Sequence, residues 1–193
     1  GNEFAFMMQA IQNIELLKGY EIQKIVTGCP HCFNTLKNEY PELGADFEVV
    51  HHTQLINQLI REGRLLLKDG GKFNGKKITF HDPCYLGRAN DVYEAPREVL
   101  EKLDAELVEM KRSKAKGLCC GAGGAQMFKD AEKGNKEINI ERTQDAIEVN
   151  ADYIATGCPF CNTMMTDGIK HFEKEEKVKV LDIAELISNA ADL

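Results

Sequence analysis

The feature that most constrains the fold of this 193-residue chain is a glycine-rich turn that opens with two adjacent cysteines, residues 118–124 (LCCGAGG). Five further cysteines lie around it in three groups. They are Cys84 in HDPC, Cys158 and Cys161 in TGCPFC, and Cys29 and Cys32 in TGCPHC. A site built from these side chains requires segments that are distant in the sequence to meet in the fold.

The cysteine usage itself indicates the kind of site. The seven cysteines are odd in number and cluster in C-x-x-C and Cys-Cys pairs, with no secretory signal. Disulfide frameworks are typical of secreted domains, whereas such clusters in a reducing compartment are typical of metal ligands or redox thiols. The pattern therefore predicts a metal or thiol site.

Composition excludes several classes of protein. A hydrophobic content of 43% and a charged content of 28% are typical of globular proteins. The net charge of −7 disfavours nucleic-acid partners, because phosphates require a positive surface. No apolar run approaches the roughly 20 residues that span a bilayer. We expect a cytoplasmic protein that binds no nucleic acid and has no membrane span of its own.

Short β-branched segments alternate with segments of helical periodicity along the chain. We predict strands at 22–27, 47–50, 77–80, 107–110, 153–156 and 178–181. We predict helices at 3–18, 30–39, 53–61, 95–103, 125–150 and 182–189, and another that begins at the second C-x-x-C. This alternation predicts an α/β fold with a parallel β-sheet and flanking helices.

The cysteines are predicted to converge at one edge of this sheet. In parallel sheets, ligands bind beyond the carboxyl ends of the strands. Cys84 and both C-x-x-C pairs directly follow a predicted strand, and the Cys-Cys turn follows residues 107–110 after a short basic loop.

The order helix, strand, T-G-C-P-x-C, helix, strand, helix occurs twice. The second copy is preceded by the Cys84 strand and the Cys-Cys-Gly turn, whereas the first copy begins at Gly1. We therefore predict two related units, residues 1–75 and 76–193, of which the first is truncated. The polar, glycine-bearing segment 65–75 is the predicted boundary. We expect the chain to be a piece of a longer protein, with a further cysteine and Cys-Cys-Gly turn upstream.

The five cysteines of the second unit exceed what one zinc ion binds. Zinc takes four tetrahedral ligands, and the adjacent side chains of Cys119 and Cys120 diverge. A cluster of several irons offers separate vertices and suits soft thiolates. The turn glycines also let the backbone approach closely and leave amide groups free to face sulfur. The set favours an iron–sulfur cluster.

The phrases CPHCFNTLKNEYP, HDPCYLGR, CCGAGG and CPFC resemble the cysteine-rich CCG domain of the family that contains heterodisulfide reductase and glycolate oxidase iron–sulfur subunits. The likeness covers nearly the whole chain and looks most like the C-terminal region of larger membrane-associated members. It implies a pair of similar α/β units and a noncubane [4Fe–4S] cluster. The implied ligands are Cys84, Cys119, Cys120, Cys158 and Cys161. Cys29 and Cys32 would then belong to a second, incomplete site.

The resemblance also implies an iron–sulfur oxidoreductase subunit that transfers electrons between a soluble donor and a disulfide, quinone or membrane partner. Its expected partners are other parts of the parent enzyme: a flavoprotein, a ferredoxin-type iron–sulfur domain, or a membrane or quinone-reactive part. The parent protein would lie at the cytoplasmic face of the membrane. We expect little turnover from this chain alone.

Two other functions also fit the cysteines. Some members of the family hold zinc at one of two sites, so a zinc-stabilised interaction domain would use four of the five thiols. A metal-free thiol–disulfide exchange module would instead cycle Cys158 and Cys161, or Cys29 and Cys32. In the truncated unit, we interpret Cys29 and Cys32 as free thiols or a disulfide.

The remaining polar residues near the motifs receive more ordinary interpretations. His81 and Asp82 fit either groups that support the ligands or a cap at the strand end. We interpret His51 and His52 as surface or packing residues. Arg88 and Arg142 fit either groups that face a carboxylate or the negative charge of a cluster, or solvated arginines, and we favour the solvated interpretation. The glycine-rich turn lacks the Lys-Ser/Thr of a phosphate loop, so we reject nucleotide binding there.

Overall fold

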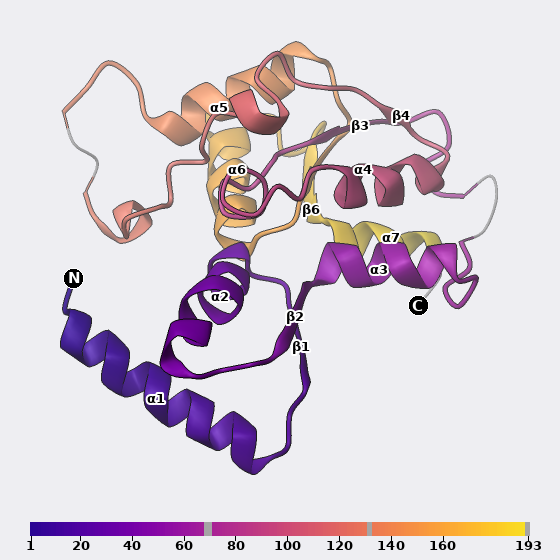
Figure 1. Ribbon diagram of the computed structural model, residues 1–193. Helices are drawn as coiled ribbons and strands as arrows, with labels where there is room; N and C mark the ends of the chain where they lie inside the picture. Colours follow the sequence, from indigo (N-terminus) through magenta and orange to yellow (C-terminus); the bar gives the residue numbers. More distant parts are fainter. Residues whose placement is uncertain (68–70, 131–132, 192–193) are drawn as a thin grey trace.

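The computed structural model describes residues 1–67, 71–130 and 133–191. Its strands form two parallel sheets with helices packed around them (Figure 1). The smaller sheet pairs β1 (Lys24–Thr27) with β2 (Glu48–His51). The larger sheet has the order β4 (Glu106–Leu107), β3 (Lys77–Phe80), β5 (Tyr153–Thr156) and β6 (Lys179–Asp182). The predicted α/β class with parallel sheets and flanking helices is confirmed.

Seven α-helices flank the sheets among the described residues. They are α1 (Glu3–Gly19), α2 (Pro30–Asn34), α3 (His52–Arg61), α4 (Glu94–Leu100), α5 (Ile138–Glu148), α6 (Pro159–His171) and α7 (Ile183–Ala191). Both α2 and α6 begin with a proline directly after the first cysteine of a C-x-x-C pair. Proline suits the first helical turn because the backbone N–H it lacks has no helical partner there. Each pair therefore sits where a strand ends and a helix begins.

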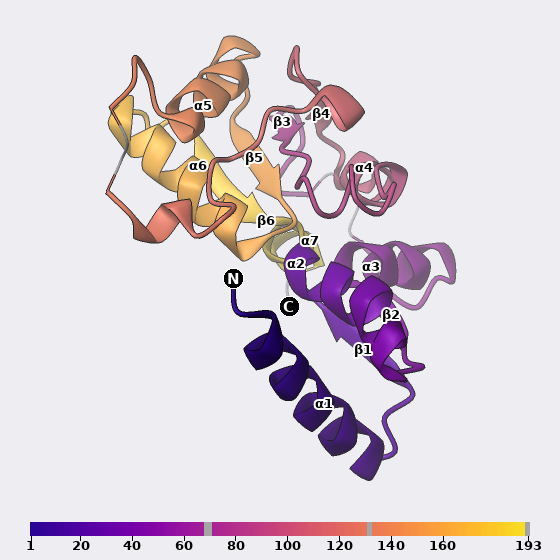
Figure 2. The ribbon, with the colours of Figure 1, turned by 60° about the vertical axis from the view of Figure 1, so that its left-hand side comes forward.

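The larger sheet is buried on both faces, as expected of a parallel sheet covered by crossover helices. On one face, Ile78 and Phe80 of β3 pack in a core with residues of α4 and α7. On the other face, Ile154 of β5 packs with residues of α5 and α6. Successive strand residues point to opposite faces, so the two cores are filled alternately. The carboxyl ends of the strands are left at the edge that faces α2 and α3 (Figure 2).

The strand pairs that precede the two C-x-x-C motifs share one register. Thr27 of β1 lies opposite His51 of β2, and Thr156 of β5 lies opposite Asp182 of β6. Both threonines lie two residues before the first cysteine of their pair. This correspondence agrees with the internal repeat seen in the sequence.

The division into residues 1–75 and 76–193 stays a prediction. Ile56 and Ile60 of α3 pack against the core that contains Ile78, and the buried Phe73 belongs to that same core. Residues on both sides of the predicted boundary thus share one apolar core. Residues 68–70 of the predicted boundary segment lie outside the described residues.

The long helix predicted at 125–150 is wrong over its first half. The chain forms a short 3-10 turn at Gln126–Phe128, and α5 begins only at Ile138. Gly124 and Ala125 both have positive φ, at 66° and 61°, which is incompatible with a right-handed helix start. Residues 131–132 of this predicted helix lie outside the described residues.

Two other predicted elements are shorter than expected. The helix predicted at 30–39 divides into α2 and a π-helical turn, Thr35–Glu39, followed by a 3-10 turn, Tyr40–Leu43. The strand predicted at 107–110 pairs only as Glu106–Leu107, although the Val108 N–H still donates to the Ile78 carbonyl at 2.9 Å.

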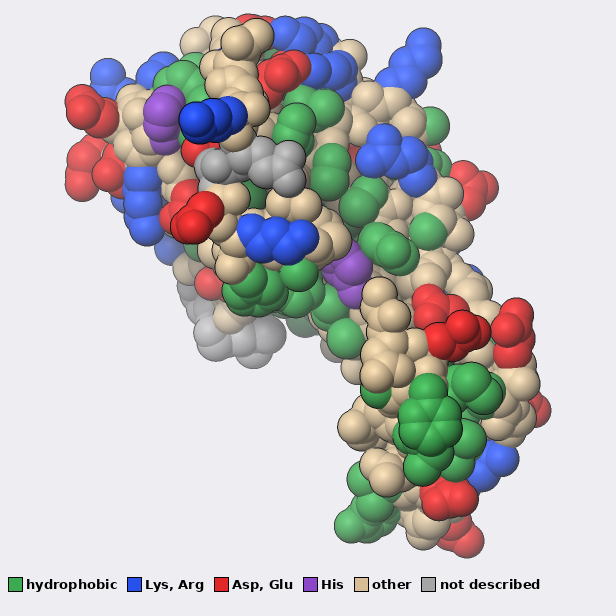
Figure 3. Space-filling model, turned by 90° about the vertical axis from the view of Figure 1, so that its left-hand side faces the viewer, with side chains coloured by type: hydrophobic (Ala, Val, Ile, Leu, Met, Phe, Trp, Pro, Cys, Tyr) green, Lys and Arg blue, Asp and Glu red, His purple; other side chains and the backbone are tan. Residues whose placement is uncertain are grey.

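Helix α1 carries large apolar side chains that are exposed in this structure. Phe4 is 73% exposed, and Phe6, Met7, Met8 and Ile11 are each at least 40% exposed. Figure 3 shows apolar side chains gathered on the lobe that contains this helix. In the described part of the chain, no helix combines the length and apolarity needed to cross a membrane.

Candidate metal centre

The structure brings five cysteines together beyond the carboxyl ends of the strands, namely Cys84, Cys119, Cys120, Cys158 and Cys161. Cys120, Cys158 and Cys161 are buried in one cluster, and Cys119 packs against it. The chain of thiol contacts runs from Cys84 to Cys119, then to Cys120, Cys161 and Cys158. Three segments that are distant in the sequence thus supply one group of sulfur atoms, as predicted from the strand-end pattern.

Contacts among these thiols favour negative charge on two of them. Hydrogen bonds from Cys120 and Cys84 hold the pKa of Cys119 far below its usual range. A hydrogen bond from Cys161, and a further one from His31, lower the pKa of Cys158 to about 5 against the opposing effect of burial. Thiolates are the form of cysteine that binds metals, so this site presents anionic sulfur before any cation arrives.

The other three thiols hold their protons as donors to these neighbours. The hydrogen bond to Cys119 raises the pKa of Cys120 to about 12 and that of Cys84 further. The pKa of Cys161 is raised by its hydrogen bonds to Cys120 and Cys158 and by burial. A metal that binds all five sulfurs must therefore displace protons from this group.

Gly121 gives the turn its shape. Its φ of +90° is a conformation that side-chain-bearing residues rarely adopt, and an added Cβ would lie 3.2 Å from the Ile138 Cβ. Its backbone N–H donates a hydrogen bond to the Cys119 sulfur at 3.3 Å. The turn thus directs a main-chain amide at the sulfur of a candidate ligand.

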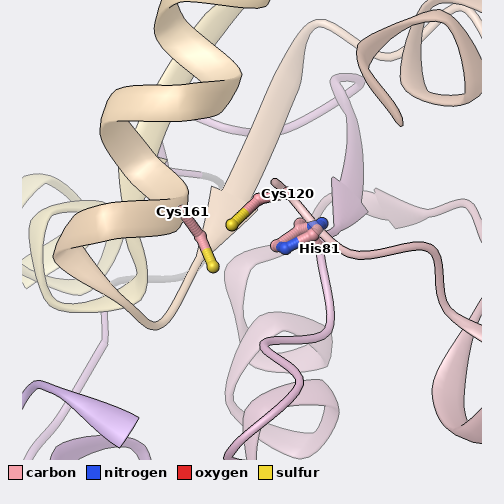
Figure 4. A group of neighbouring side chains, drawn as sticks. All are labelled: His81, Cys120 and Cys161. Carbon is pink, nitrogen blue, oxygen red and sulfur yellow. The ribbon is translucent and has the colours of Figure 1, made fainter. Parts of the chain in front are cut away.

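His81 follows β3 directly and lies fully buried beside the thiols. A ring nitrogen of His81 and the sulfurs of Cys120 and Cys161 all lie within 4.8 Å of one another (Figure 4). Burial, followed by the nearby charge of Arg142, lowers the pKa of this imidazole to about 3. The structure therefore favours the interpretation of His81 as a group that supports the candidate ligands over its interpretation as a cap at the strand end.

Arg142 corrects the prediction of a solvated arginine. It lies fully buried on α5 and donates from Nε to His81 Nδ1 at 3.0 Å. Its Nη1 donates to the Arg112 carbonyl at 2.6 Å and lies 3.4 Å from the Asp145 carboxylate. The sequence contained no signal for this burial, because it depends on contacts with His81 and Arg112, which lie in two other segments. Arg88, by contrast, is exposed and donates to the Gly117 carbonyl.

Asp82 has a structural role, as the strand-end interpretation proposed. Its carboxylate accepts two hydrogen bonds from the buried Arg97, at 2.8 and 3.0 Å, and a third from the Lys114 N–H at 2.7 Å. Arg97 also pairs with Glu109. These bonds tie the end of β3 to the loop that leads to the Cys-Cys turn.

The first C-x-x-C pair lies next to this group rather than apart from it. Cys29 is half-buried and Cys32 is exposed. Between Cys29 and Cys158 lies His31, whose pKa is raised to about 9 by hydrogen bonds first to Cys158 and then to Cys29. The His31 ring packs on Tyr85, with centroids 4.5 Å apart, and meets the edge of Phe160 at 5.4 Å.

Sequence reasoning missed His31, although the repeat contains a signal for it. The first copy reads C-P-H-C where the second reads C-P-F-C, so His31 and Phe160 occupy corresponding positions. A histidine that is present in only one of the two equivalent motifs indicates that this position differs in role between the two copies.

His51 and His52 are packing residues rather than surface residues. His51 is fully buried, and its Nδ1 lies 2.8 Å from the Thr53 hydroxyl. Burial lowers the pKa of His51 to about 3. His52 Nε2 pairs with the Asp182 carboxylate at 2.8 Å, across the two sheets.

The donor set fits a soft, multi-metal group better than a single zinc ion. Five thiols linked by successive contacts exceed four tetrahedral positions, and thiolate is the ligand of iron–sulfur centres. A histidine and a main-chain amide lie within reach of the sulfurs, as is typical of the groups that tune such centres.

Comparison with known proteins agrees with these features. A family model described as cysteine-rich domain (CCG) matches residues 1–37 and 78–166, which include all seven cysteines. The chain is 46% identical over 191 residues to the probable iron–sulfur-binding oxidoreductase FadF of Bacillus subtilis, covering 98% of the chain and 26% of that protein. It is 41% identical to the EtfAB:quinone oxidoreductase of Syntrophomonas wolfei, covering 100% of the chain and 27% of that protein.

A third relative is a component of the dihydromethanophenazine:CoB–CoM heterodisulfide reductase of Methanosarcina barkeri. The chain is 36% identical to this protein, and the match covers 95% of the chain and 44% of that protein. The chain thus spans between about a quarter and less than half of the length of these relatives. Because the family model matches more than half of the chain, and the match includes every cysteine of the site, this chain belongs to the cysteine-rich CCG domain family.

Proposed function

We propose that this chain is an electron-transfer module of an iron–sulfur oxidoreductase. Its ligand set holds a noncubane [4Fe–4S] cluster and consists of Cys84, Cys119, Cys120, Cys158 and Cys161. The observation that carries the proposal is the continuous contact among these five thiols at the strand ends. The names of the relatives, which are iron–sulfur oxidoreductases or components of such enzymes, support it.

The chain's own residues would bind and insulate this group. A bound cluster supplies one-electron redox chemistry, which the side chains themselves lack. Cys158 and Cys161 lie at the start of α6, where the positive end of the helix dipole favours thiolate charge. Burial of Cys120, Cys158 and Cys161 keeps water from these sulfurs, and both burial and hydrogen bonding set the potential of such a site.

A single zinc ion is the second candidate. The proximity of His81, Cys120 and Cys161 favours it, because their three ligand atoms lie within 4.8 Å of one another. With one more thiolate, this set would complete four-coordination. Such a protein would be a zinc-stabilised interaction domain rather than a redox module.

The electron donor and acceptor would be other parts of the parent enzyme. Our expectation of a flavoprotein, ferredoxin-type or quinone-reactive partner stands as part of this proposal. One relative is named EtfAB:quinone oxidoreductase and another a probable membrane-anchored ferredoxin. We therefore propose that the parent protein works at the cytoplasmic face of a membrane. The exposed apolar face of α1 is consistent with burial against a further part of that protein.

Anaerobic reconstitution with iron and sulfide tests the proposal. The expected result is about four irons per chain, with a paramagnetic signal in one redox state by electron paramagnetic resonance. One zinc and no iron would establish the second candidate. A protein that binds neither metal but cycles between dithiol and disulfide forms would support thiol exchange instead.

A further inference from the structure

Among the described residues, one ring nitrogen of His81 has a hydrogen-bond partner and the other has none. Nδ1 accepts a hydrogen bond from Arg142 Nε at 3.0 Å. Nε2 is buried and has no hydrogen-bond partner among the described residues. Because Arg142 engages Nδ1, Nε2 is the nitrogen that is free to face Cys120 and Cys161. Figure 4 shows the ring with one nitrogen turned toward the two sulfurs.

Arg142 determines which ring nitrogen of His81 carries the proton. A guanidinium group only donates hydrogen bonds, so the Nδ1 that it contacts must be the unprotonated nitrogen. A neutral imidazole with Nδ1 unprotonated carries its hydrogen on Nε2. The free Nε2 is therefore an N–H donor, and its lone pair is not available to bind a metal.

The arginine that imposes this tautomer is itself held in one place. The Arg142 side chain is fully buried and is anchored by the Arg112 carbonyl and the Asp145 carboxylate. Asp145 also accepts two hydrogen bonds from the Arg112 side chain, at 2.6 and 2.8 Å. This series of contacts leaves His81 little freedom to turn its ring over.

We propose that His81 is a positioning residue that donates a hydrogen bond from Nε2 to sulfur at the metal centre, and that it is not a metal ligand. The acceptor is a thiolate of Cys120 or Cys161, or a sulfur of the bound group. This inference rests on the proposed iron–sulfur function and assigns one of its tuning groups. Without such an acceptor, this buried N–H would carry the full cost of its desolvation.

Such a donor changes the redox behaviour of the site in a defined direction. A hydrogen bond to sulfur stabilises the more negative, reduced form more than the oxidised form. The His81 donor should therefore raise the reduction potential of the centre. Its removal should make the centre harder to reduce without removing any metal.

The tautomer can be tested on the metal-free protein. In ¹⁵N-labelled wild-type protein, long-range proton–nitrogen correlation spectra should show His81 with Nε2 protonated and Nδ1 unprotonated. An Nδ1-protonated or a rapidly exchanging ring would overturn the proposal. This measurement does not depend on cluster assembly, so it separates failure of this inference from failure of the proposed function.

The role toward sulfur can be tested on the reconstituted protein with two variants. His81→Gln keeps an amide donor and a carbonyl that accepts from Arg142, whereas His81→Leu removes both. We expect equal iron content in both variants and the wild type. We expect a shift to lower potential only in His81→Leu, measured by redox titration with electron paramagnetic resonance.

Three results would overturn the proposal. Loss of iron from both variants, or strong ¹⁵N hyperfine coupling from histidine in the wild-type signal, would identify His81 as a ligand. Equal potentials in His81→Leu and the wild type would show that the residue only fills space. If leucine prevents folding, the tautomer and the hyperfine coupling of the wild-type protein still decide the question. If wild-type protein binds no iron, the proposed function fails, and the tautomer is still measured.

Discussion

Gly168 of α6 and Thr143 of α5 lie so close that no side chain fits between them. A Cβ added to Gly168 would lie 2.7 Å from the Thr143 Cβ, closer than real Cβ atoms come to another heavy atom. This contact fixes how closely α6, which is preceded by its N-cap residue Cys158, packs against α5. The position of the second C-x-x-C pair therefore depends on a glycine ten residues further along the same helix.

Gly168→Ala should destabilise the protein, although alanine normally stabilises a helix interior by about 1 kcal/mol relative to glycine. Overpacking here should instead lower the free energy of unfolding by about 1–3 kcal/mol. Urea unfolding of the metal-free protein measures the change. Gly19→Ala is the matched control, because Gly19 is also helical but has open space around it. A Gly168→Ala protein as stable as the control would contradict the close packing of the two helices.

Gly121→Ala should disturb the Cys-Cys turn. The φ of +90° and the nearby Ile138 should together cost about 1–3 kcal/mol of stability and weaken iron uptake. Gly123→Ala in the same turn meets no atom within 4 Å and should change neither property appreciably. Unfolding curves and iron analysis after reconstitution check both variants. Equal behaviour of the two variants would mean that the backbone conformation of Gly121 is not required.

Asp82→Asn should be strongly destabilising, because it removes one carboxylate from the buried Arg97. With Glu109 left as a partner, we expect a loss of about 2–3 kcal/mol in the free energy of unfolding. Glu48→Gln makes the same chemical change in the exposed Lys24–Glu48 pair and should cost less than about 0.5 kcal/mol. Chemical denaturation of both variants gives the comparison. Similar small losses would show that the buried pair contributes no more than a surface pair.

Acid should weaken the fold through His51. Its pKa falls from 6.5 to about 3 in the folded protein, so the unfolded chain binds the proton more readily. The free energy of unfolding should therefore decrease as the pH falls from about 6.5 toward 3, by about 1.4 kcal/mol per pH unit for this group. Above pH 6.5 both states are neutral at this residue, and the effect disappears.

Denaturation of metal-free His51→Gln at pH 7 and pH 5 checks this prediction. The variant should lose part of the acid sensitivity and retain the part contributed by His81, whose pKa is lowered in the same direction. His171→Gln, at an exposed position, serves as the control and should keep the wild-type dependence. An unchanged slope in His51→Gln would show that His51 is not the titrating group.

Cys120→Ala should abolish the iron-dependent signal, whereas Cys29→Ala should leave it intact. Cys120 lies between Cys119 and Cys161 in the buried thiol group, whereas Cys29 is linked to Cys158 through His31. Iron content and electron paramagnetic resonance after reconstitution measure both variants. Equal loss in the two would mean that the first C-x-x-C pair belongs to the same site.

The class of fold and the identity of the candidate ligands could be predicted from the sequence. Strand-forming segments recur directly before Cys84, Cys29 and Cys158, and a parallel sheet collects its strand ends at one edge. The spacing of the cysteines and the two T-G-C-P-x-C phrases are local features, so they can be recognised without any tertiary contact. The same locality explains the partial failure at 125–150, where a helix was predicted from residue 125, but Ala125 has a positive φ and α5 begins only at Ile138.

The surroundings of the sulfurs depend on the tertiary structure. Arg142 and Asp145 lie on α5, whereas His81 follows β3, and nothing in either neighbourhood indicates that they lie in one buried series. His31 likewise reaches Cys158 only because the smaller sheet places α2 against the start of α6. The burial of a side chain and its hydrogen-bond partners depend on contacts between segments that are distant in the sequence. A local sequence pattern indicates secondary structure and motifs but not these contacts. The sequence by itself determined the class of fold and the candidate ligands, and the tertiary structure decided which groups surround them.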